Sequence, residues 1–416
     1  MLIKNVLSVF SSKIGVVLTT LLISIILARS LGVEDRGLLA SILIFPQLLL
    51  ALFEGGMRQA ATYYISGGRS TSEHVVGSVM FYWLISGSLG FCVCFFLIYN
   101  FAGNIEFKLI LLSSLILPID LLCSFFRGYF LGKENFKKYN LVLVLPKILN
   151  LGLLSLIVFF SNVSVFLALV AVLISTIINL LQILSIIFIK EGIKPKINTK
   201  LFKEMFSKGL VYSLSLFLIV ANYKVDIFIL TQLSTNTQVG LYTVVNQIGE
   251  SLWQLPGAIV VVLMSSSANR NGRSDNVSFY NKVLISSRLT FYVTLLSSIV
   301  LALIAPIAIP LLFGNDFEES ALILLYLLPG LVFMVYFKVI NSDYAGDGKP
   351  HIALYVMIPV TLLNIALNFI LIPENGAIGA AVASSISYIL ASLIFMCYYS
   401  RSNKFSFFEF FFKYKR

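Results

Sequence analysis

Charged side chains are scarce in this sequence, and so are histidine, cysteine and tryptophan. Asp, Glu, Lys and Arg make up 12% of the 416 residues, against about 25% in a typical soluble domain, and the mean hydropathy is +0.94. This composition excludes an ordinary soluble enzyme and indicates a chain that crosses a membrane many times. The net charge of +11 is assigned to basic loops on one side of that membrane, and no nucleic-acid partner is expected.

The few metal-ligating and nucleophilic residues show no catalytic pattern. His74 and His351 are isolated, and the four cysteines lie inside apolar runs, so neither a metal centre, a cofactor nor a disulfide is expected. The segment GYFLGKEN (128–135) is no phosphate-binding P-loop, because its glycines are too close and no Ser or Thr follows the lysine. The predicted outer loops are short, which disfavours a polysaccharide polymerase or ligase with a large catalytic loop.

Twelve hydrophobic runs are long enough to cross a bilayer, which takes roughly 20 residues. The first run contains Lys13 and lacks a small-residue cleavage site after it, so we interpret it as a transmembrane helix rather than a signal peptide. Pro118 interrupts the fourth run, and Pro306 and Pro310 are expected to bend or end the ninth. The predicted spans are 6–28, 37–57, 75–99, 107–127, 141–160 and 164–189, then 209–231, 239–263, 283–305, 320–341, 352–372 and 377–399.

A polar stretch at 190–208 separates these spans into two halves. It contains six lysines and no arginine, and we interpret it as a cytoplasmic connector. Its second part is either a short amphipathic helix on the inner leaflet or a solvated loop. The predicted organisation is an N-terminal six-helix lobe at 1–189, the connector at 190–208, a C-terminal six-helix lobe at 209–399 and a basic cytoplasmic tail at 400–416.

The distribution of basic residues orients the spans. With the N-terminus in the cytoplasm, 22 of the 30 Lys and Arg residues lie in cytoplasmic segments. The outer loops then contain Arg29, Arg36 and Lys108 only, and the other basic residues lie within spans. Both termini are therefore expected in the cytoplasm.

Weak internal similarity indicates that the two halves are repeats. ARSLGVEDRGLLA follows the first span and LTQLSTNTQVGLYTV follows the seventh, with Gly37 and Gly240 in matching places 203 residues apart. Because each half has an even number of spans, both halves enter the membrane from the same side, which gives parallel repeats. The predicted fold is an all-α integral membrane protein with about twelve transmembrane helices in two six-helix bundles around a central cavity.

Four segments resemble the polysaccharide-repeat flippases, the Wzx-type O-antigen transporters of the multidrug/oligosaccharidyl-lipid/polysaccharide exporter superfamily. The resemblance covers nearly the whole chain, and its most specific part is the fourth segment. VLMSSSA (262–268) departs from the family, which often has a proline there. The segments are ARSLGVEDRG (28–37), FEGGMRQAATYYIS (53–66), VDIFIL with VGLYTVVNQIGESLWQLP (225–256), and AGDGKPHIALYVMIPVTLLNIALNFILIPENGAIGAAVASSISY (345–388).

The resemblance implies an exporter that moves an undecaprenyl-diphosphate-linked oligosaccharide to the outer leaflet of the bacterial cytoplasmic membrane. It implies lobes that rock about the cavity, a proton or sodium gradient as driving force, and membrane lipids, a polysaccharide polymerase and a chain-length regulator as partners. A monomer is expected because two lobes already enclose a cavity. A multidrug or cation antiporter of the same superfamily and a flippase for peptidoglycan precursor, capsular or teichuronic units are the alternatives.

Charges inside the spans are candidate site residues, because an ionised group at the bilayer centre costs roughly 2.5–3.5 kcal/mol. Asn222 and Asp226 share one face of the seventh span, and Lys224 points elsewhere. Either Lys224 or Asp226 lines the cavity with a partner from another helix, or the charge belongs to a structural ion pair between helices. Glu250 ends a polar stripe with the amides three and four residues before it, which indicates cation coupling, sugar binding or helix packing.

Other candidates lie nearer the cytoplasmic side. Lys13 and Lys147 either bind the diphosphate or extend to the headgroups, as Arg288 and Lys338 are expected to do. Asp120 is a further deep carboxylate, which either serves transport or stabilises the break at the preceding proline.

Two pairs at helical spacing complete the candidates. Glu54 and Arg58, four residues apart, form either a gate or a plain interfacial salt bridge. Asn364 and Asn368 share a face of the eleventh span, where they contact the cargo or join helices, and the amides of the sixth span have the same two readings.

Overall fold

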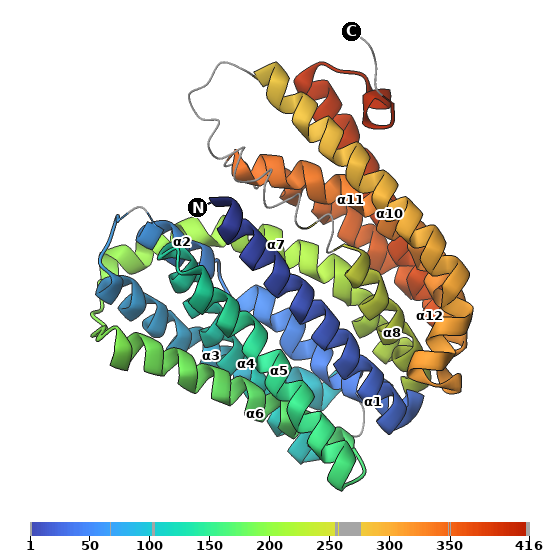
Figure 1. Ribbon diagram of the computed structural model, residues 1–416, viewed down its shortest axis with the longest axis horizontal. Coiled ribbons are helices and arrows are strands. Elements are labelled where there is room, and N and C mark those ends of the chain that lie inside the picture. The colour runs from blue at the N-terminus through green and yellow to red at the C-terminus, as the bar shows by residue number, and fades with distance from the viewer. Residues whose placement is uncertain are drawn as a thin grey trace. The chain divides into compact units, whose positions relative to one another are not determined.

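The computed structural model describes residues 2–66, 68–101, 105–253, 257, 276–347, 349 and 351–412, and these residues are mostly helical, with no strand among them. Within this part, nine helices are long and apolar enough to cross a membrane. Two of these, α1 and α12, each contain two of the predicted spans. The all-α fold with about twelve transmembrane helices is thereby confirmed (Figure 1).

The chain forms two compact units, Met1–Val220 and Ala221–Arg416, whose boundary falls inside α7. The lobe boundaries predicted around 190–208 stay a prediction, but a helix does begin at Thr199 and runs on into the next span. The elements of the first unit are α1 (Leu2–Phe53), α2 (Met57–Ser66), α3 (Ser72–Phe101), α4 (Phe107–Gly132), α5 (Phe136–Phe160), α6 (Val165–Leu184), the π-helical turn η1 (Ser185–Lys190) and the first part of α7 (Thr199–Leu233). Those that follow are α8 (Asn236–Leu252), α10 (Asn276–Phe313), η2 (Asn315–Phe317), α11 (Glu319–Gly346), α12 (His351–Asn403) and η3 (Phe407–Phe410).

Glycines make the sharp turns inside the two longest helices. Gly32 in α1 has φ 74° and Gly376 in α12 has φ 52°, a region that side chains with a Cβ rarely adopt. Helical hydrogen bonding continues on both sides of Gly32, so the connection predicted at 29–36 is a tight turn at this glycine rather than an open loop, and Arg36 is helical and only 7% exposed. Both glycines lie in short gaps predicted between spans, at 29–36 and 373–376.

Prolines lie inside several of the helices without ending them. α10 continues past Pro306 and Pro310 to Phe313, so the expected end of the helix near these prolines is not found. Polar residues cap several helix starts: the side chains of Asn135, Ser164 and Thr235 accept hydrogen bonds from backbone N–H groups three residues further on.

Each unit has one central helix. In α4, 67% of the most apolar window is buried, and in α11 72%, against 17–39% in the other membrane helices. α4 holds the fourth predicted span and α11 the tenth, so the two central helices occupy matching positions in the repeat. The exposed apolar faces of the outer helices are available to lipid.

The burial pattern also supports the proposed repeat register. With Gly37 aligned to Gly240, Leu39 aligns with Tyr242 and Ile42 with Val245, and all four of these side chains are buried. At these two pairs of positions, residues that are 203 apart are buried in both halves.

Candidate functional site

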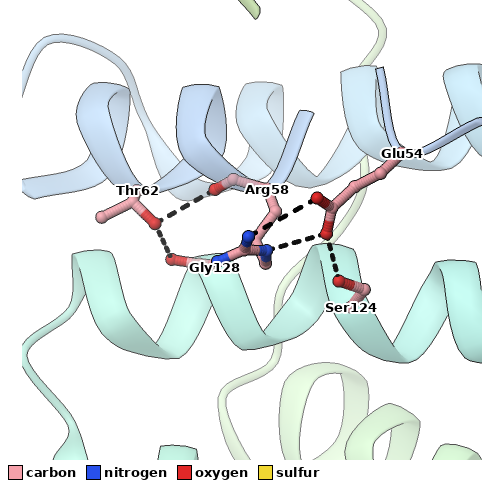
Figure 2. Close-up of polar contacts among 5 residues, drawn as sticks. All are labelled: Glu54, Arg58, Thr62, Ser124 and Gly128. Carbon is pink, nitrogen blue, oxygen red and sulfur yellow. Dashed lines mark hydrogen bonds and ion pairs between the residues drawn. The ribbon is translucent and has the colours of Figure 1, made fainter. Parts of the chain in front are cut away.

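The first polar group lies at the break between α1 and α2. Arg58 donates from Nε to Glu54 Oε1 over 2.7 Å and from Nη2 to Oε2 over 3.5 Å. Ser124 of α4 donates to the same carboxylate over 2.5 Å. Thr62 donates to the backbone carbonyls of Arg58 and Gly128, at 3.1 and 3.0 Å, so α2 is joined to α4 (Figure 2).

Charges of α4 and α5 extend this group into what we call the N-lobe cation cluster: Arg58, Glu54, Arg127, Asp120 and Lys147. Arg127 acts electrostatically on both Glu54 and Asp120. Lys147 acts on Asp120 as well. Neither Arg127 nor Lys147 makes a hydrogen bond or close ion pair with any described residue. The cluster therefore has three cations and two carboxylates, and its surplus charge is positive.

Amide side chains with unused acceptors lie on the same helices. The side-chain oxygens of Asn150, Asn179 and Gln182 are buried and have no hydrogen-bond partner in the described part of the protein. Asn150 follows Lys147 by three residues on α5, which places both on one side of that helix. Lys13 of α1 is half-buried and likewise has no ion pair or hydrogen bond to a described residue.

The second unit contains an ion pair between two helices. Lys224 of α7 donates to Glu250 of α8 over 2.6 Å. The predicted division of the α7 faces agrees with this: Asn222 and Asp226 are fully buried, whereas the Lys224 side chain is 21% exposed. Sequence reasoning proposed a partner from another helix for Lys224 and a polar role for Glu250, but it did not pair the two residues.

Asp226 is the centre of a separate hydrogen-bonded set. Its carboxylate accepts from the Tyr242 hydroxyl, from Ser384 Oγ at 2.8 Å and from the Ile227 N–H at 2.7 Å. All these groups are buried. In the repeat register Asp226 aligns with Ile23, which packs with Leu39 in an apolar cluster, so the polar set is specific to the second half.

Asn364 and Asn368 are fully buried in the first part of α12. Asn364 Nδ2 donates to Ser387 Oγ over 3.1 Å, and Asn368 Nδ2 donates to the Asn364 side-chain oxygen over 3.1 Å. The pair thus joins the two halves of α12 across the kink, an arrangement that fits the helix-packing alternative.

Lys338 of α11 does not follow the expectation that it extends to the headgroups. Its ammonium lies 3.9 Å from the ring centroid of Trp253 and 4.9 Å from that of Tyr223. No spacing rule in the sequence indicates this contact, because the rings come from α7 and from the end of α8. We call Lys224, Glu250, Lys338 and Asp226 the C-lobe ionic cluster; its charges balance.

These clusters can bind charged and polar groups of a ligand. Within the described residues no group of three or more His, Cys, Asp or Glu side chains could hold a metal ion. The N-lobe cation cluster offers surplus positive charge and free amide acceptors. The C-lobe ionic cluster offers two carboxylates, one paired with a lysine and one held by hydroxyl groups.

Many apolar helices in two repeats, each with ionisable side chains inside the bundle, define a polytopic membrane protein. The profile of the family described as "Polysaccharide biosynthesis protein" matches residues 2–264. The chain belongs to this family. The departure predicted at 262–268 lies outside the described residues.

Known proteins agree with this assignment. The protein named "Probable lipid II flippase MurJ" of Thermotoga maritima is 31% identical over 156 residues, which is 36% of this chain and 33% of that relative's length. A solved inward-facing multidrug resistance MATE family transporter of the MOP superfamily superposes with a TM-score of 0.79, at 18% identity over 94% of each chain. Lipid II flippase MurJ in an inward closed conformation gives 0.77, at 18% identity over 98% of this chain and 89% of the other. At such identity these structures show the shared fold.

Proposed function

We propose that this protein is a flippase that moves an undecaprenyl-diphosphate-linked oligosaccharide repeat unit, of O-antigen or capsular type, from the inner to the outer leaflet by alternating access. Membership of the polysaccharide family and similarity to a protein named as a lipid II flippase support this class of cargo. The setting we propose is the bacterial cytoplasmic membrane, with both termini in the cytoplasm. A polymerase and a chain-length regulator that act on the flipped unit are proposed partners, and the proposed working form is a monomer.

The observation that carries this proposal is the positive surplus of the N-lobe cation cluster. A diphosphate is recognised by Arg and Lys donors, whose hydrogen bonds to phosphate are charge-assisted and short. Arg127 and Lys147 make no such bonds to described residues, and two nearby carboxylates leave their combined charge unbalanced. We therefore propose Arg127 and Lys147 as the residues that bind the diphosphate, with Lys13 and Arg58 as further cations.

The sugar part of the cargo needs hydrogen-bond acceptors as well as donors. The free side-chain oxygens of Asn150, Asn179 and Gln182 would accept bonds from sugar hydroxyls. Leaving these buried oxygens without partners costs about 1–3 kcal/mol each, so a hydroxyl-rich ligand would recover this energy. A purely apolar drug would not.

The Asp226 set is the proposed coupling element. A carboxylate with two hydroxyl neighbours is suited to a hard cation or a proton. The matching position in the first half is an isoleucine, so the carboxylate is not required by the fold. Asn364 and Asn368 would hold this part of α12 in place. Asn364 donates to Ser387, which is three residues after the Ser384 that contacts Asp226.

The experiment is complementation of a strain that lacks the chromosomal gene. We expect deletion to abolish surface polymer and to trap lipid-linked units in the inner leaflet. Lys147→Ala and Arg127→Ala should restore little polymer, whereas Lys137→Ala, which removes an exposed lysine of α5, should restore it fully. Normal polymer in the deletion strain would contradict the proposal.

A multidrug or cation antiporter is the second candidate. It is favoured by the superposition on a multidrug transporter and by the carboxylates of the C-lobe ionic cluster, since cationic drugs pair with carboxylates. The deletion strain separates the two functions: unchanged polymer with increased sensitivity to cationic drugs would establish the antiporter.

A further inference from the structure

The segment that follows α12 contains six phenylalanines in eight residues. It reads FSFFEFFF (405–412), and we call it the aromatic tail. The chain reverses at Lys404, which has a left-handed φ of 56°, and the short helix η3 then begins. Ser406 accepts a hydrogen bond from the Phe408 N–H over 3.4 Å, and its own N–H donates to Glu409 over 3.1 Å, which forms a capping box. The aromatic tail is therefore a folded turn rather than a loose end.

One side of the aromatic tail is fixed to three membrane helices of the second unit. The Phe410 ring is fully buried, with its centroid 5.7 Å from that of Tyr336 in α11 and 6.3 Å from that of Tyr399 in α12. The Tyr336 hydroxyl donates to the backbone carbonyl of Phe410 over 3.3 Å. The Tyr292 hydroxyl of α10 donates to the backbone carbonyl of Phe411 over 3.1 Å. These contacts attach the tail to α10, α11 and α12 together.

The other side of the aromatic tail is apolar and exposed. The side chains of Phe408 and Phe412 are 65% and 67% exposed, although the buried Phe410 lies between them in the sequence. Burying a phenylalanine ring away from water contributes about 1.5–3 kcal/mol. The two exposed rings therefore favour an apolar surrounding outside the protein.

The tail lies next to an apolar stripe of α10 that is available to lipid. Tyr292, which holds the tail, belongs to this stripe, and the exposed Tyr398 of α12 comes directly before Tyr399, which packs on the tail. Tyrosines are concentrated where a membrane meets water, because the ring is apolar and the hydroxyl is polar. The tail is therefore placed at the level of a membrane surface. The exposed residues of the stripe, spaced by four, three and four, are Ile285, Leu289, Tyr292 and Leu296.

The sequence around the tail is basic. Residues 401–416 contain five Lys and Arg residues and one acidic residue. A Lys or Arg near an anionic leaflet gains about 1 kcal/mol from the surface potential, and aromatic rings insert at the boundary between headgroups and acyl chains. Anionic lipid matches both the exposed rings and the surplus positive charge.

We propose that the aromatic tail anchors the second unit to a layer of anionic lipid. Phe408 and Phe412 insert at the boundary between headgroups and acyl chains, and the basic residues of 401–416 bind the phosphate groups of the headgroups. Phe410 keeps the tail on α10, α11 and α12, so the anchor fixes the depth of these helices in the bilayer. The anchor goes beyond the proposed function and does not depend on the cargo. In the proposed orientation the lipid is that of the inner leaflet.

An added tryptophan reports where the exposed side of the tail lies. Phe408→Trp and Phe412→Trp each replace an exposed ring by an indole in the full chain, which is placed in nanodiscs of phosphatidylcholine and phosphatidylglycerol in equal amounts. The emission of the wild type, which has two tryptophans, is subtracted. We expect the added emission to lie at short wavelength and to be mostly lost when the acyl chains carry bromine, because bromine quenches an indole on contact.

Asp316→Trp is the matched control, since this residue lies in the exposed turn η2. Its added emission should be quenched by iodide in the buffer and not by brominated lipid. Brominated lipid that leaves the emission of Phe408→Trp and Phe412→Trp unchanged would overturn the anchor. Quenching of these two variants by iodide would then place the rings in water, and resistance to both quenchers would place them against protein.

The preference for anionic lipid is tested in the Phe408→Trp background. Quenching should be stronger in the mixed nanodiscs than in nanodiscs of phosphatidylcholine alone, with all acyl chains brominated. Replacing Lys413, Lys415 and Arg416 together by glutamine should abolish this difference. Replacing three exposed lysines elsewhere by glutamine should retain it. Equal quenching in the two lipid compositions before any charge is removed would overturn the role of the basic residues. The three control lysines are Lys137, Lys200 and Lys203.

Discussion

Gly128 of α4 lies directly against the backbone of Arg58 in α2. A Cβ atom added at Gly128 would be 2.2 Å from the Arg58 carbonyl oxygen, which is closer than any real Cβ contact. The same carbonyl accepts the hydroxyl of Thr62. The two helices can therefore come this close only because glycine has no side chain. The position of the Arg58 guanidinium depends on this close approach.

Gly128→Ala is expected to push α2 away from α4. The overpacking should cost about 1–3 kcal/mol and lower the Tm of the detergent-solubilised protein. Gly152→Ala in α5 is the matched control, since an added Cβ there meets nothing within 4 Å and alanine favours a helix more than glycine. Equal Tm values for the two variants would contradict the close packing.

Glu54→Gln should weaken the group at the break between α1 and α2. The amide keeps an acceptor for Ser124 but loses the charge that neutralises Arg58, and we expect a loss of about 2 kcal/mol in the free energy of unfolding. Glu106→Gln removes a carboxylate from an exposed pair with Lys108, in which the side chains are 65% and 55% exposed, and should cost under about 1 kcal/mol. Denaturant titration of both variants measures the difference. Similar losses would mean that the Glu54 pair contributes no more than a surface ion pair.

Glu191 attaches the connector to Tyr129 and Lys138, and the stability that these contacts contribute depends on pH. Burial raises its pKa, but hydrogen bonds from Lys138 and Tyr129, each 2.5 Å long, and the positive charges of Lys138 and Lys133 outweigh this and leave the pKa below its ordinary 4.5. The stabilisation is therefore complete above pH 4.5 and is lost as the pH falls through the lower folded value.

Glu191→Gln should remove this dependence and loosen the connector at neutral pH. Trypsin cleavage after the connector lysines, at pH 7.5, should be faster than in the wild type. Tm measured between pH 7 and pH 3 should fall less steeply in the variant. A variant with the wild-type slope would show that other carboxylates carry the pH dependence.

Asp226→Asn should separate transport from its driving force. The carboxylate accepts three hydrogen bonds, and the NH2 group of an amide would face groups that also donate. The amide carries no negative charge, so a bound cation would lose its charged ligand. We expect flipping in proteoliposomes to lose its dependence on an imposed sodium or proton gradient. Asp316→Asn, in the exposed turn η2, should keep that dependence. An unchanged gradient response in Asp226→Asn would exclude Asp226 as the coupling residue.

Hydropathy was sufficient to predict the helices, but not the conformation of the connections between them. Lipid requires every span to be helical, so long apolar runs near Ile42 or Val356 could have no other structure. The gaps predicted at 29–36 and 373–376 contain the turns at Gly32 and Gly376, but hydropathy did not show that helical hydrogen bonding would continue on both sides of a single left-handed residue. Pro306 and Pro310 were expected to bend or end α10, and the helix continues past both, because a membrane helix can accommodate proline.

The site was predictable as a set of residues but not as a set of pairs. Helical spacing correctly grouped Glu54 with Arg58 and separated Lys224 from Asp226. Spacing within one helix contains no information about Glu250 and Lys224, which lie on different helices. Arg127 was placed in a cytoplasmic segment because it is next to the end of a span, yet its charge acts on Asp120 inside the bundle. The contact of Lys338 with Trp253 likewise depends on packing alone.

The alignment of Ile23 with Asp226 and of Leu39 with Tyr242 implies a division of labour between the duplicated halves. The first half has two apolar side chains at these positions, whereas the second half has a carboxylate and a hydroxyl that are hydrogen-bonded to each other. A chain made of two first halves would carry no such carboxylate, and a chain made of two second halves would carry two. The halves are therefore similar in architecture but not interchangeable at these positions.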